Sequence, residues 1–370
     1  MKICVYAICK NELKFVDKWL ENMSEADYIC VLDTGSTDGT YEKLKEDSRV
    51  TKVKQKEIKP WRFDVARNES MKLCPKDTDV YVCTDFDELF EKGWAEQIRK
   101  HWKVDEYNRG FYTYAWSHSD IGEPQDVFKY DKIHTKDFHW IFPVHEVLQP
   151  NDGIAQIGLD FGTNIYLHHY QDRTKERKYY FDLLELSCKE NPEDSHTRML
   201  LAREYILQGN LEAALKEFLE VLKMPDVDKP NKRLVLLYSL LHVAEIYADL
   251  KNYDEVIWYC QEFIKEDYTY REPYLLLADI YNDMEMYTLA EAMIKCALEY
   301  GKQHYDWIEE AKTFLDRPYD ALSVAEFKLG KFEEAKQNMS KALKHNPKDV
   351  RLLQNYVACL EKLLSKEIKK

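Results

Sequence analysis

The chain has 370 residues, of which 45% are hydrophobic and 32% are charged, and its formal net charge is −14. This length predicts two domains, and the composition is that of a chain with a buried core rather than of a disordered one. The acidic balance argues against nucleic acid or an anionic membrane surface as a partner, because both require a concentrated basic face.

Up to about residue 175 the pattern alternates between strand and helix. Short runs rich in Val, Ile and aromatic residues predict strands, at residues 2–8, 28–33, 50–55, 79–84, 110–117 and 164–170. Alternation of strands with helices predicts a mainly parallel sheet with both faces covered. Ligands of such sheets bind at the carboxyl ends of the strands.

Helices are predicted between these strands. Asn11 is expected to cap the first, whose apolar face carries Leu13, Val16, Trp19, Leu20 and Met23. Residues 34–40 form a loop in which Ser36 or Thr37 can cap the next helix. A further helix is predicted over 63–74.

From about residue 193 a helical repeat replaces the strands. Four units carry matching small, aromatic and aliphatic residues, and they start near Leu201, Val243, Leu277 and Leu322. The second and third units are 34 residues apart, which is the tetratricopeptide period, whereas the fourth is looser. A last helix over 350–364 would cap the stack. The predicted organisation is an α/β domain at 1–175, a linker helix at 176–192 and an all-α repeat domain at 193–370.

The nine cysteines are scattered and include no Cys-x-x-Cys pair, so we expect neither a disulfide framework nor a zinc site. Those in strand-like runs are expected to be small buried hydrophobes: Cys4, Cys9, Cys30 and Cys83. The N-terminal run meets Glu12 too early for a signal peptide, and no apolar stretch approaches the roughly 20 residues that span a bilayer. We expect a soluble, cytoplasmic protein.

Asp85 and Asp87 follow a strand-like run in the segment VYVCTDFDELF. Like charges in close quarters are costly unless a cation lies between them or water reaches them. Residues i and i+2 of an extended segment point the same way, so both carboxylates could share Mg²⁺ or Mn²⁺ while Phe86 points into the core. Acidic triplets are common on surfaces, and the position after a buried strand is what favours a metal site.

Asp33 ends another predicted strand and is followed by TGSTDGT. One interpretation is a helix-capping turn in which Ser36, Thr37 and Asp38 satisfy free amides. The other is a carboxylate that accepts hydrogen bonds from a ribose or a base. The two interpretations do not exclude each other.

Five segments occur in a characteristic order: VYAICKNE, VLDTGSTDGT, WRFDVARNES, TDFDE and FPVHE. Over roughly residues 1–170 the chain resembles the family 2 glycosyltransferases of the GT-A fold. With repeats after this domain, it is similar to the bacterial group that includes the sublancin S-glycosyltransferase. The resemblance implies an α/β nucleotide-diphospho-sugar transferase domain followed by an all-α tetratricopeptide-repeat solenoid. The QxxRW motif of membrane-bound processive synthases is absent, since QIRKHW at 97–102 does not match it, and this disfavours polysaccharide synthesis.

The same resemblance implies roles for the donor-side residues. Asp33 would lie at the nucleoside, and Arg67 near the diphosphate or the nucleoside. Asp85 and Asp87 would be the pair of carboxylates at the metal. Asp87 would bind the metal directly, and Asp85 would lie nearer the ribose. For Arg67 the alternative is a surface pair with Glu69 or Asp64.

On the acceptor side, the resemblance makes Glu146 a candidate general base with His145 beside it; the alternative is a local polar network of these two residues. A histidine of a later strand often completes the metal shell in this family, and His168 and His169 are the candidates. Neighbours in a strand face opposite sides, so one of the two faces away from the site. His168 is the preferred ligand.

The expected activity is inverting, metal-dependent transfer of a sugar from a nucleotide-sugar, with UDP-sugar preferred. A peptide or protein side chain is the expected acceptor, because such repeats commonly bind polypeptide; they could instead pair two protomers. One alternative is transfer to a lipid-linked or surface-polysaccharide precursor. Another is a non-catalytic scaffold with a relic transferase domain, but the acidic residues remain in place. A nucleotidyltransferase is disfavoured because the N-terminal segment has no Gly-rich phosphate loop.

Overall fold

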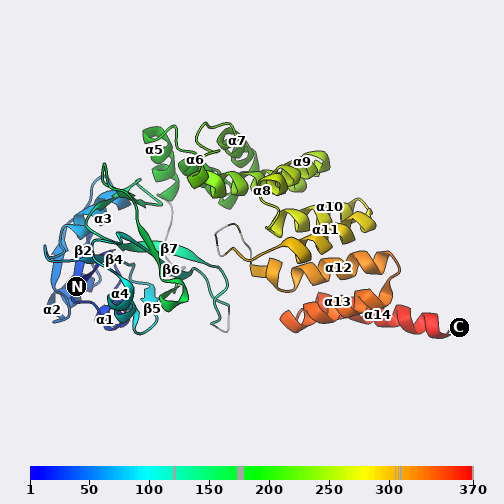
Figure 1. The fold of residues 1–370 in the computed structure, drawn as a ribbon, viewed down its shortest axis with the longest axis horizontal. Helices are drawn as coiled ribbons and strands as arrows, with labels where there is room; N and C mark the ends of the chain where they lie inside the picture. The colour runs from blue at the N-terminus through cyan, green and yellow to red at the C-terminus, as the bar shows by residue number, and fades with distance from the viewer. Residues whose placement is uncertain (120–121, 173–178, 305, 307, 309–310, 369–370) are drawn as a thin grey trace. The chain divides into compact units, whose positions relative to one another are not determined.

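The structure is a computed structural model that describes the chain except residues 120–121, 173–178, 305, 307, 309–310 and 369–370. The chain divides into two compact units, Met1–Glu190 and Asn191–Lys370 (Figure 1). The first is α/β and the second is helical, which confirms the predicted fold class. The predicted linker helix at 176–192 corresponds to α5, Tyr180–Glu190, which lies in the first unit; residues 176–178 are outside the described part.

A nine-stranded sheet forms the centre of the first unit, in the order β3-β2-β1-β4-β7-β6-β11-β5, with β10 paired to β6. Its strands are β1 Ile3–Cys9, β2 Tyr28–Asp33, β3 Lys52–Gln55, β4 Val80–Cys83, β5 Glu88–Phe90, β6 Arg109–Ala115, β7 Val127–His134, β10 Gly158–Asp160 and β11 Tyr166–His169. A separate antiparallel pair consists of β8 Phe138–Ile141 and β9 Val147–Pro150.

The sheet is mixed, so the prediction of a mainly parallel sheet was wrong in its second half. β7 runs antiparallel to both β4 and β6, and β5 runs antiparallel to β11. β5, β7, β8, β9 and β10 were not predicted. In β7 the polar residues Lys129, Asp131 and Lys132 interrupt the apolar alternation that marks a strand.

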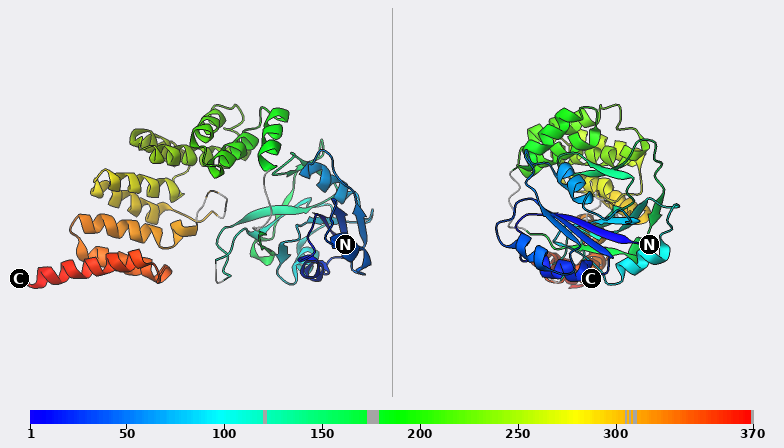
Figure 2. Two further views of the ribbon diagram at one scale, coloured as in Figure 1. Left: turned by 180° about the vertical axis from the view of Figure 1, so that it is seen from behind. Right: turned by 90° about the vertical axis from the view of Figure 1, so that its left-hand side faces the viewer.

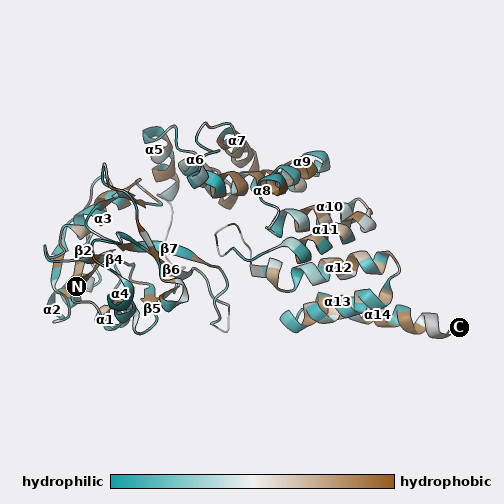
Figure 3. Cartoon of the chain, viewed as in Figure 1, coloured by the Kyte–Doolittle hydropathy of each residue, from teal (hydrophilic) through white to brown (hydrophobic). Residues whose placement is uncertain are grey.

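Helices cover both faces of the sheet. They are α1 Val16–Met23, α2 Thr40–Glu46, α3 Phe63–Met71 and α4 Trp94–His101. β1 alternates between two cores: Ile3 and Val5 pack with α1, α2 and α4, whereas Cys4 and Tyr6 pack with α3 and the β8–β9 pair. Figure 3 shows apolar colour along parts of the sheet and hydrophilic colour over much of α4.

The first helix begins later than predicted, because Asn11 does not cap it. Asn11 has a φ of 57°, and Leu13 is 38% exposed, outside the apolar face. The Asn11 side chain accepts a hydrogen bond from the amide of Thr37 at 2.8 Å, and its own amide donates to Ser36 Oγ at 2.8 Å. Ser36 and Thr37 therefore do not cap α2, whose N-cap is Gly39. These contacts join the loops that follow β1 and β2.

The second unit is a series of helix hairpins followed by a last helix (Figure 2). Its helices are α6 Ser195–Leu207, α7 Leu211–Val221, α8 Arg233–Asp249, α9 Tyr253–Glu266, α10 Glu272–Asp283, α11 Tyr287–Tyr300, α12 Arg317–Lys328, α13 Phe332–His345 and α14 Val350–Ile368. The small repeat positions are buried as predicted, at Ala202, Ala214, Ala244, Ala278, Ala290 and Ala335. Among the described residues, no helix combines the length and the apolar character that a membrane span requires.

Candidate active site

Asp33 and Asp85 lie at the same edge of the sheet. Asp33 is the last residue of β2, and Asp85 follows the end of β4. Both strands run parallel to β1, which lies between them, so the axes of β2 and β4 are about 10 Å apart. The predicted gathering of carboxylates at strand ends is therefore present.

The Asp33 carboxylate organises its own loop. Oδ1 accepts hydrogen bonds from the amides of Gly35 and Ser36, at 2.9 and 2.8 Å, and from Gln55 Nε2 at 3.0 Å. Burial raises the pKa of Asp33, but the bonds from Ser36 and Gln55 outweigh it and the net shift is downward. Asp33 is fully buried and holds its own turn, and of the residues expected to satisfy free helix amides only Asp38 accepts from a backbone amide of α2, that of Thr40 at 3.0 Å. The role of Asp33 at a ribose or a base stays a prediction.

Asp85, Phe86 and Asp87 form a turn rather than the predicted extended segment. The amide of Glu88 donates to the carbonyl of Asp85 at 3.1 Å, and the amide of Asp85 donates to the Glu88 carboxylate at 2.9 Å. Phe86 points into the core as predicted, stacked on Trp19 with ring centres 4.3 Å apart. The two aspartates therefore leave the turn with different neighbours.

Two cations hold the Asp85 carboxylate. Arg67 approaches both oxygens, with Nη1 3.0 Å from Oδ1 and Nη2 3.1 Å from Oδ2, and Lys132 Nζ lies 3.3 Å from Oδ2. Burial raises the pKa of Asp85, but the charges of Arg67 and Lys132 hold it far below its usual range. The alternative of an exposed Arg67 paired with Glu69 or Asp64 is wrong, because the Arg67 side chain is buried and paired elsewhere.

Lys132 and Glu88 belong to this group but were not predicted. Lys132 is 5% exposed and Glu88 is 2% exposed; Nζ and Oε1 are 3.4 Å apart. Glu88 Oε1 also accepts a hydrogen bond from the Tyr114 hydroxyl at 2.9 Å. Burial raises the pKa of Glu88, partly offset by Lys132. In the sequence, this group could have been indicated by Lys132 itself, because it is a charged residue on the same strand face as Tyr130 and His134.

Arg67 also reaches the predicted acceptor side. Its Nε donates to Oε1 of Glu146, whose side chain is 10% exposed. One guanidinium thus joins Asp85 to Glu146. The neighbouring His145 has a φ of 49°, and its ring lies edge-on to that of Tyr180, with centres 6.0 Å apart.

The adjacent histidines of β11 face different neighbours. His169 Nε2 lies 3.5 Å from Asp87 Oδ2. His168 Nδ1 lies 2.9 Å from His118 Nε2, and His168 Nε2 lies 3.4 Å from Glu91 Oε1. The expected alternation is present, but His169, rather than the preferred His168, is beside Asp87.

The chemistry of the donor set fits a divalent cation at Asp87. A carboxylate and an imidazole converge there, and the four carboxylates of Asp85, Asp87, Glu88 and Glu146 outnumber the two cations of Arg67 and Lys132. Mg²⁺ and Mn²⁺ accept such ligands and usually keep positions for water and substrate phosphate. Asp85 is less suited to direct binding, because its oxygens already contact cations.

Comparison with known protein families decides the class of the first unit. Residues 4–143 match the family model described as glycosyl transferase family 2. The first unit is a family 2 glycosyltransferase domain. This match confirms the predicted enzyme class, and it covers the central-sheet strands from β1 to β7 together with β8 of the separate pair.

Residues 316–349 match a tetratricopeptide repeat. They span α12 and α13, the unit whose repeat pattern is the loosest in the sequence.

Solved structures resemble the chain only weakly. A tetratricopeptide protein of Thermus thermophilus is 22% identical, with 50% of this chain and 90% of that chain covered and a TM-score of 0.36. MamA is 18% identical, with 46% and 95% covered and a TM-score of 0.35. YrrB, described as having an unusual peptide-binding site, is 14% identical, with 48% and 81% covered and a TM-score of 0.38. No curated protein matches the chain.

Proposed function

We propose that the chain transfers a sugar from a nucleotide-sugar, with UDP-sugar as the expected donor, to a side chain of a peptide or protein. The observation that carries this proposal is the connected group of Asp85, Arg67 and Glu146 at the edge of a family 2 transferase sheet. It links a carboxylate assigned to the donor with one assigned to the acceptor through a single buried cation.

On the donor side, the loop held by Asp33 would receive the nucleoside, and Asp87 would bind the divalent cation. His169 is the histidine assigned to the same ion, since its Nε2 is 3.5 Å from Asp87. Asp85 is assigned to the ribose, with Arg67 and Lys132 holding the carboxylate in place. A divalent cation on the diphosphate would offset the charge that grows there as the bond to the sugar breaks.

On the acceptor side, Glu146 is assigned the role of general base. Direct displacement with inversion requires a base that removes the proton of the acceptor nucleophile. Arg67 donates a hydrogen bond to Oε1 of this carboxylate and so keeps it oriented. His145, the neighbour of Glu146, would also lie on the acceptor side.

The second unit is proposed to recognise the polypeptide acceptor. Stacked helix hairpins present an extended surface, which suits a long ligand better than a small sugar. On α9, Asp254, Glu255, Trp258 and Tyr259 line an open hollow, and Trp258 is 51% exposed. Carboxylates beside an exposed indole would suit a basic segment of the acceptor. The resemblance to the bacterial group of S-glycosyltransferases also supports a peptide acceptor.

The test is to incubate the purified chain with a panel of sugar nucleotides and measure nucleoside diphosphate release, without acceptor and then with candidate peptides. Mass spectrometry of the peptides identifies the added sugar. We expect metal-dependent release from a UDP-sugar and a hexose-sized mass increase on the peptide. Transfer to lipid-linked precursors alone would replace the proposed acceptor, and no turnover of any donor would favour the scaffold alternative.

A further inference from the structure

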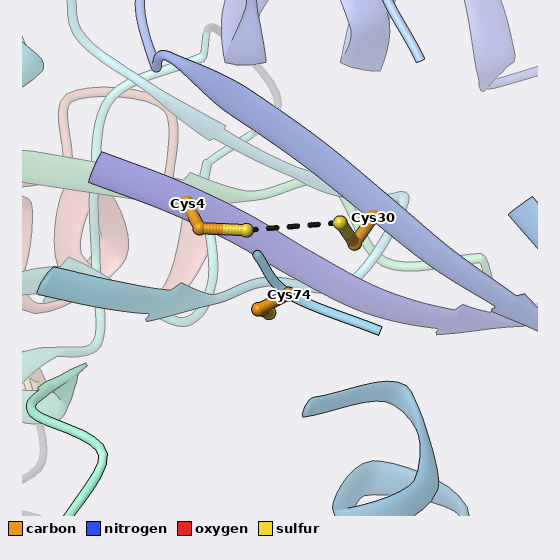
Figure 4. A group of neighbouring side chains, drawn as sticks. All are labelled: Cys4, Cys30 and Cys74. Carbon is orange, nitrogen blue, oxygen red and sulfur yellow. Dashed lines mark hydrogen bonds between the residues drawn. The ribbon is translucent and has the colours of Figure 1, made fainter. Parts of the chain in front are cut away.

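Three cysteines with no role in the proposed transfer gather on the sheet face covered by α3. Cys4 lies on β1, Cys30 on β2, and Cys74 just after the end of α3. Their sulfur atoms all lie within 4.8 Å of one another, and those of Cys4 and Cys30 are 3.8 Å apart. Figure 4 shows Cys4 and Cys30 directed toward each other from neighbouring strands, with Cys74 beside them. Within the described part of the chain, no other three His, Cys, Asp or Glu side chains bring their ligand atoms so close.

We propose that these three cysteines form a zinc-binding site that ties the end of α3 to β1 and β2. The distance between sulfurs supports this assignment. Two sulfurs bound tetrahedrally to one Zn²⁺ at about 2.3 Å lie about 3.8 Å apart. Cys4 and Cys30 already have this separation, so only Cys74 has to shift.

A disulfide is a poorer explanation of the cluster. Cys4 pairs with Tyr28 across the two parallel strands, and Cys30 pairs with Tyr6, so the two cysteines are diagonal neighbours. Diagonal Cα atoms are about 7–8 Å apart, whereas a disulfide needs about 4.4–6.8 Å. A bridging ion removes this restriction because it adds two metal–sulfur bonds between the side chains.

Charge favours Zn²⁺ over Cu(I), another ion with an affinity for thiolates. Three thiolates leave a charge of −1 around Zn²⁺ but −2 around Cu(I), and excess charge in an apolar core is costly. Lys52 of β3 pairs with Cys30 of β2 and so lies on the same face of the sheet, where its exposed side chain brings a positive charge near Cys30. Binding forms three Zn–S bonds and releases three thiol protons to solvent, with no change of oxidation state.

The fourth coordination position is assigned to water. Cys4 and Cys30 are fully buried, but Cys74 is half-buried at the helix end, so the ion can enter from that side. Three protein ligands with water in the fourth position is the arrangement found in catalytic zinc sites. Sequence spacing gave no sign of it, because the ligands come from positions 4, 30 and 74 rather than from a Cys-x-x-Cys pair.

The test uses the reduced full-length chain with Zn²⁺, and Co²⁺ as a coloured substitute. Cys74→Ser is the test variant because this side chain lies outside the fully buried core, and Cys188→Ser on α5 is the matched control. We expect one thiolate-bound Zn²⁺ per chain, Co²⁺ spectra with sulfur-to-metal charge transfer, and an affinity of this thiolate site for Zn²⁺ at least tenfold lower in Cys74→Ser only. Zn²⁺ should also raise the Tm of the wild type and of Cys188→Ser. Absence of the thiolate spectrum from the wild type, or an unchanged affinity in folded Cys74→Ser, would overturn the proposal.

Discussion

Arg67 and Glu146 form a buried ion pair, and the other side of the same guanidinium holds Asp85. Residues 18 and 79 positions away in the sequence thus meet at one cation. Burial lowers the pKa of Arg67, but the charges of Asp85 and Glu146 raise it well above its usual value, so the guanidinium stays charged. We therefore expect that a change in the contacts of either carboxylate alters the position of Arg67 and so the contacts of the other carboxylate.

Glu146→Gln is expected to lower turnover more than donor binding. The amide still accepts a hydrogen bond from Arg67 but cannot serve as the base, and loss of a general base typically costs ~10²–10⁴-fold in rate. Single-turnover kinetics and donor titration measure the two effects separately. Glu69→Gln, on α3 with only Lys56 and Lys72 as ion-pair partners among the described residues, is the control. A collapse of donor affinity with an unchanged single-turnover rate would move Glu146 to the donor site.

Asp87→Asn is expected to abolish transfer while the fold remains intact. The amide has nearly the same shape, and the Asp87 carbonyl that accepts from the Tyr170 amide at 2.7 Å is unaffected. The lost charge removes the anionic ligand, so Mn²⁺ affinity measured by calorimetry should fall together with activity. Asp105→Asn, at an exposed position, is the control. Near-normal turnover that still requires metal would reject Asp87 as the ligand.

Lys132→Met is expected to destabilise the first unit by about 3 kcal/mol, since removal of one partner of a buried ion pair leaves the other uncompensated. Glu88 would lose its nearby cation, and Asp85 one of two. Urea unfolding at pH 7 measures the change. Lys129→Met on the same strand removes only an exposed pair with Asp160 and should change stability little. If the two variants were equally stable, the ion pairs of Lys132 would contribute nothing to the free energy of unfolding.

His134 is expected to make the first unit less stable in mild acid. Burial lowers the pKa of His134 to about 4, while its Nε2 lies 2.7 Å from the Tyr6 hydroxyl. The unfolded chain, with an ordinary histidine pKa near 6.5, binds the proton first as the pH falls, so unfolding becomes easier between about pH 6.5 and 4. From pH 7 to pH 5 this residue should cost about 2 kcal/mol.

The measurement is urea unfolding of the wild type and His134→Gln at both pH values. The variant is expected to be less stable at pH 7 but to lose about 2 kcal/mol less on acidification. His101→Gln, at an exposed position on α4, should behave as the wild type. Parallel pH dependence in all three proteins would show that His134 does not titrate in this range.

A chain that ends at Glu190 is expected to retain donor hydrolysis but to lose most transfer to polypeptide. The first unit has its own sheet and core, and circular dichroism would first establish that it folds alone. In the full-length chain, Trp258→Ala should raise the KM for the peptide with little change in donor hydrolysis, because the hollow on α9 lies in the second unit. Undiminished peptide transfer by the folded first unit would reject acceptor recognition by the repeats.

Local pattern was enough to predict much of this molecule. The apolar run of β2 matches its observed bounds, Tyr28–Asp33, because a buried strand needs continuous apolar side chains. The repeat positions of the second unit are buried because each hairpin packs on its neighbours in sequence. Both features depend on residues close together in the chain, where periodicity is informative.

Long-range packing decided the composition of the site. Lys132 contacts Asp85, 47 residues away in the sequence, because β7 lies antiparallel between β4 and β6. This strand was not predicted because its polar side chains interrupt the apolar pattern. The pairing of β11 with β5 brings His169, rather than His168, beside Asp87. The sequence by itself determined which carboxylates stand at strand ends. Only the tertiary structure decided which cations and histidines reach them, because those contacts depend on strand order and register, which have no local signature.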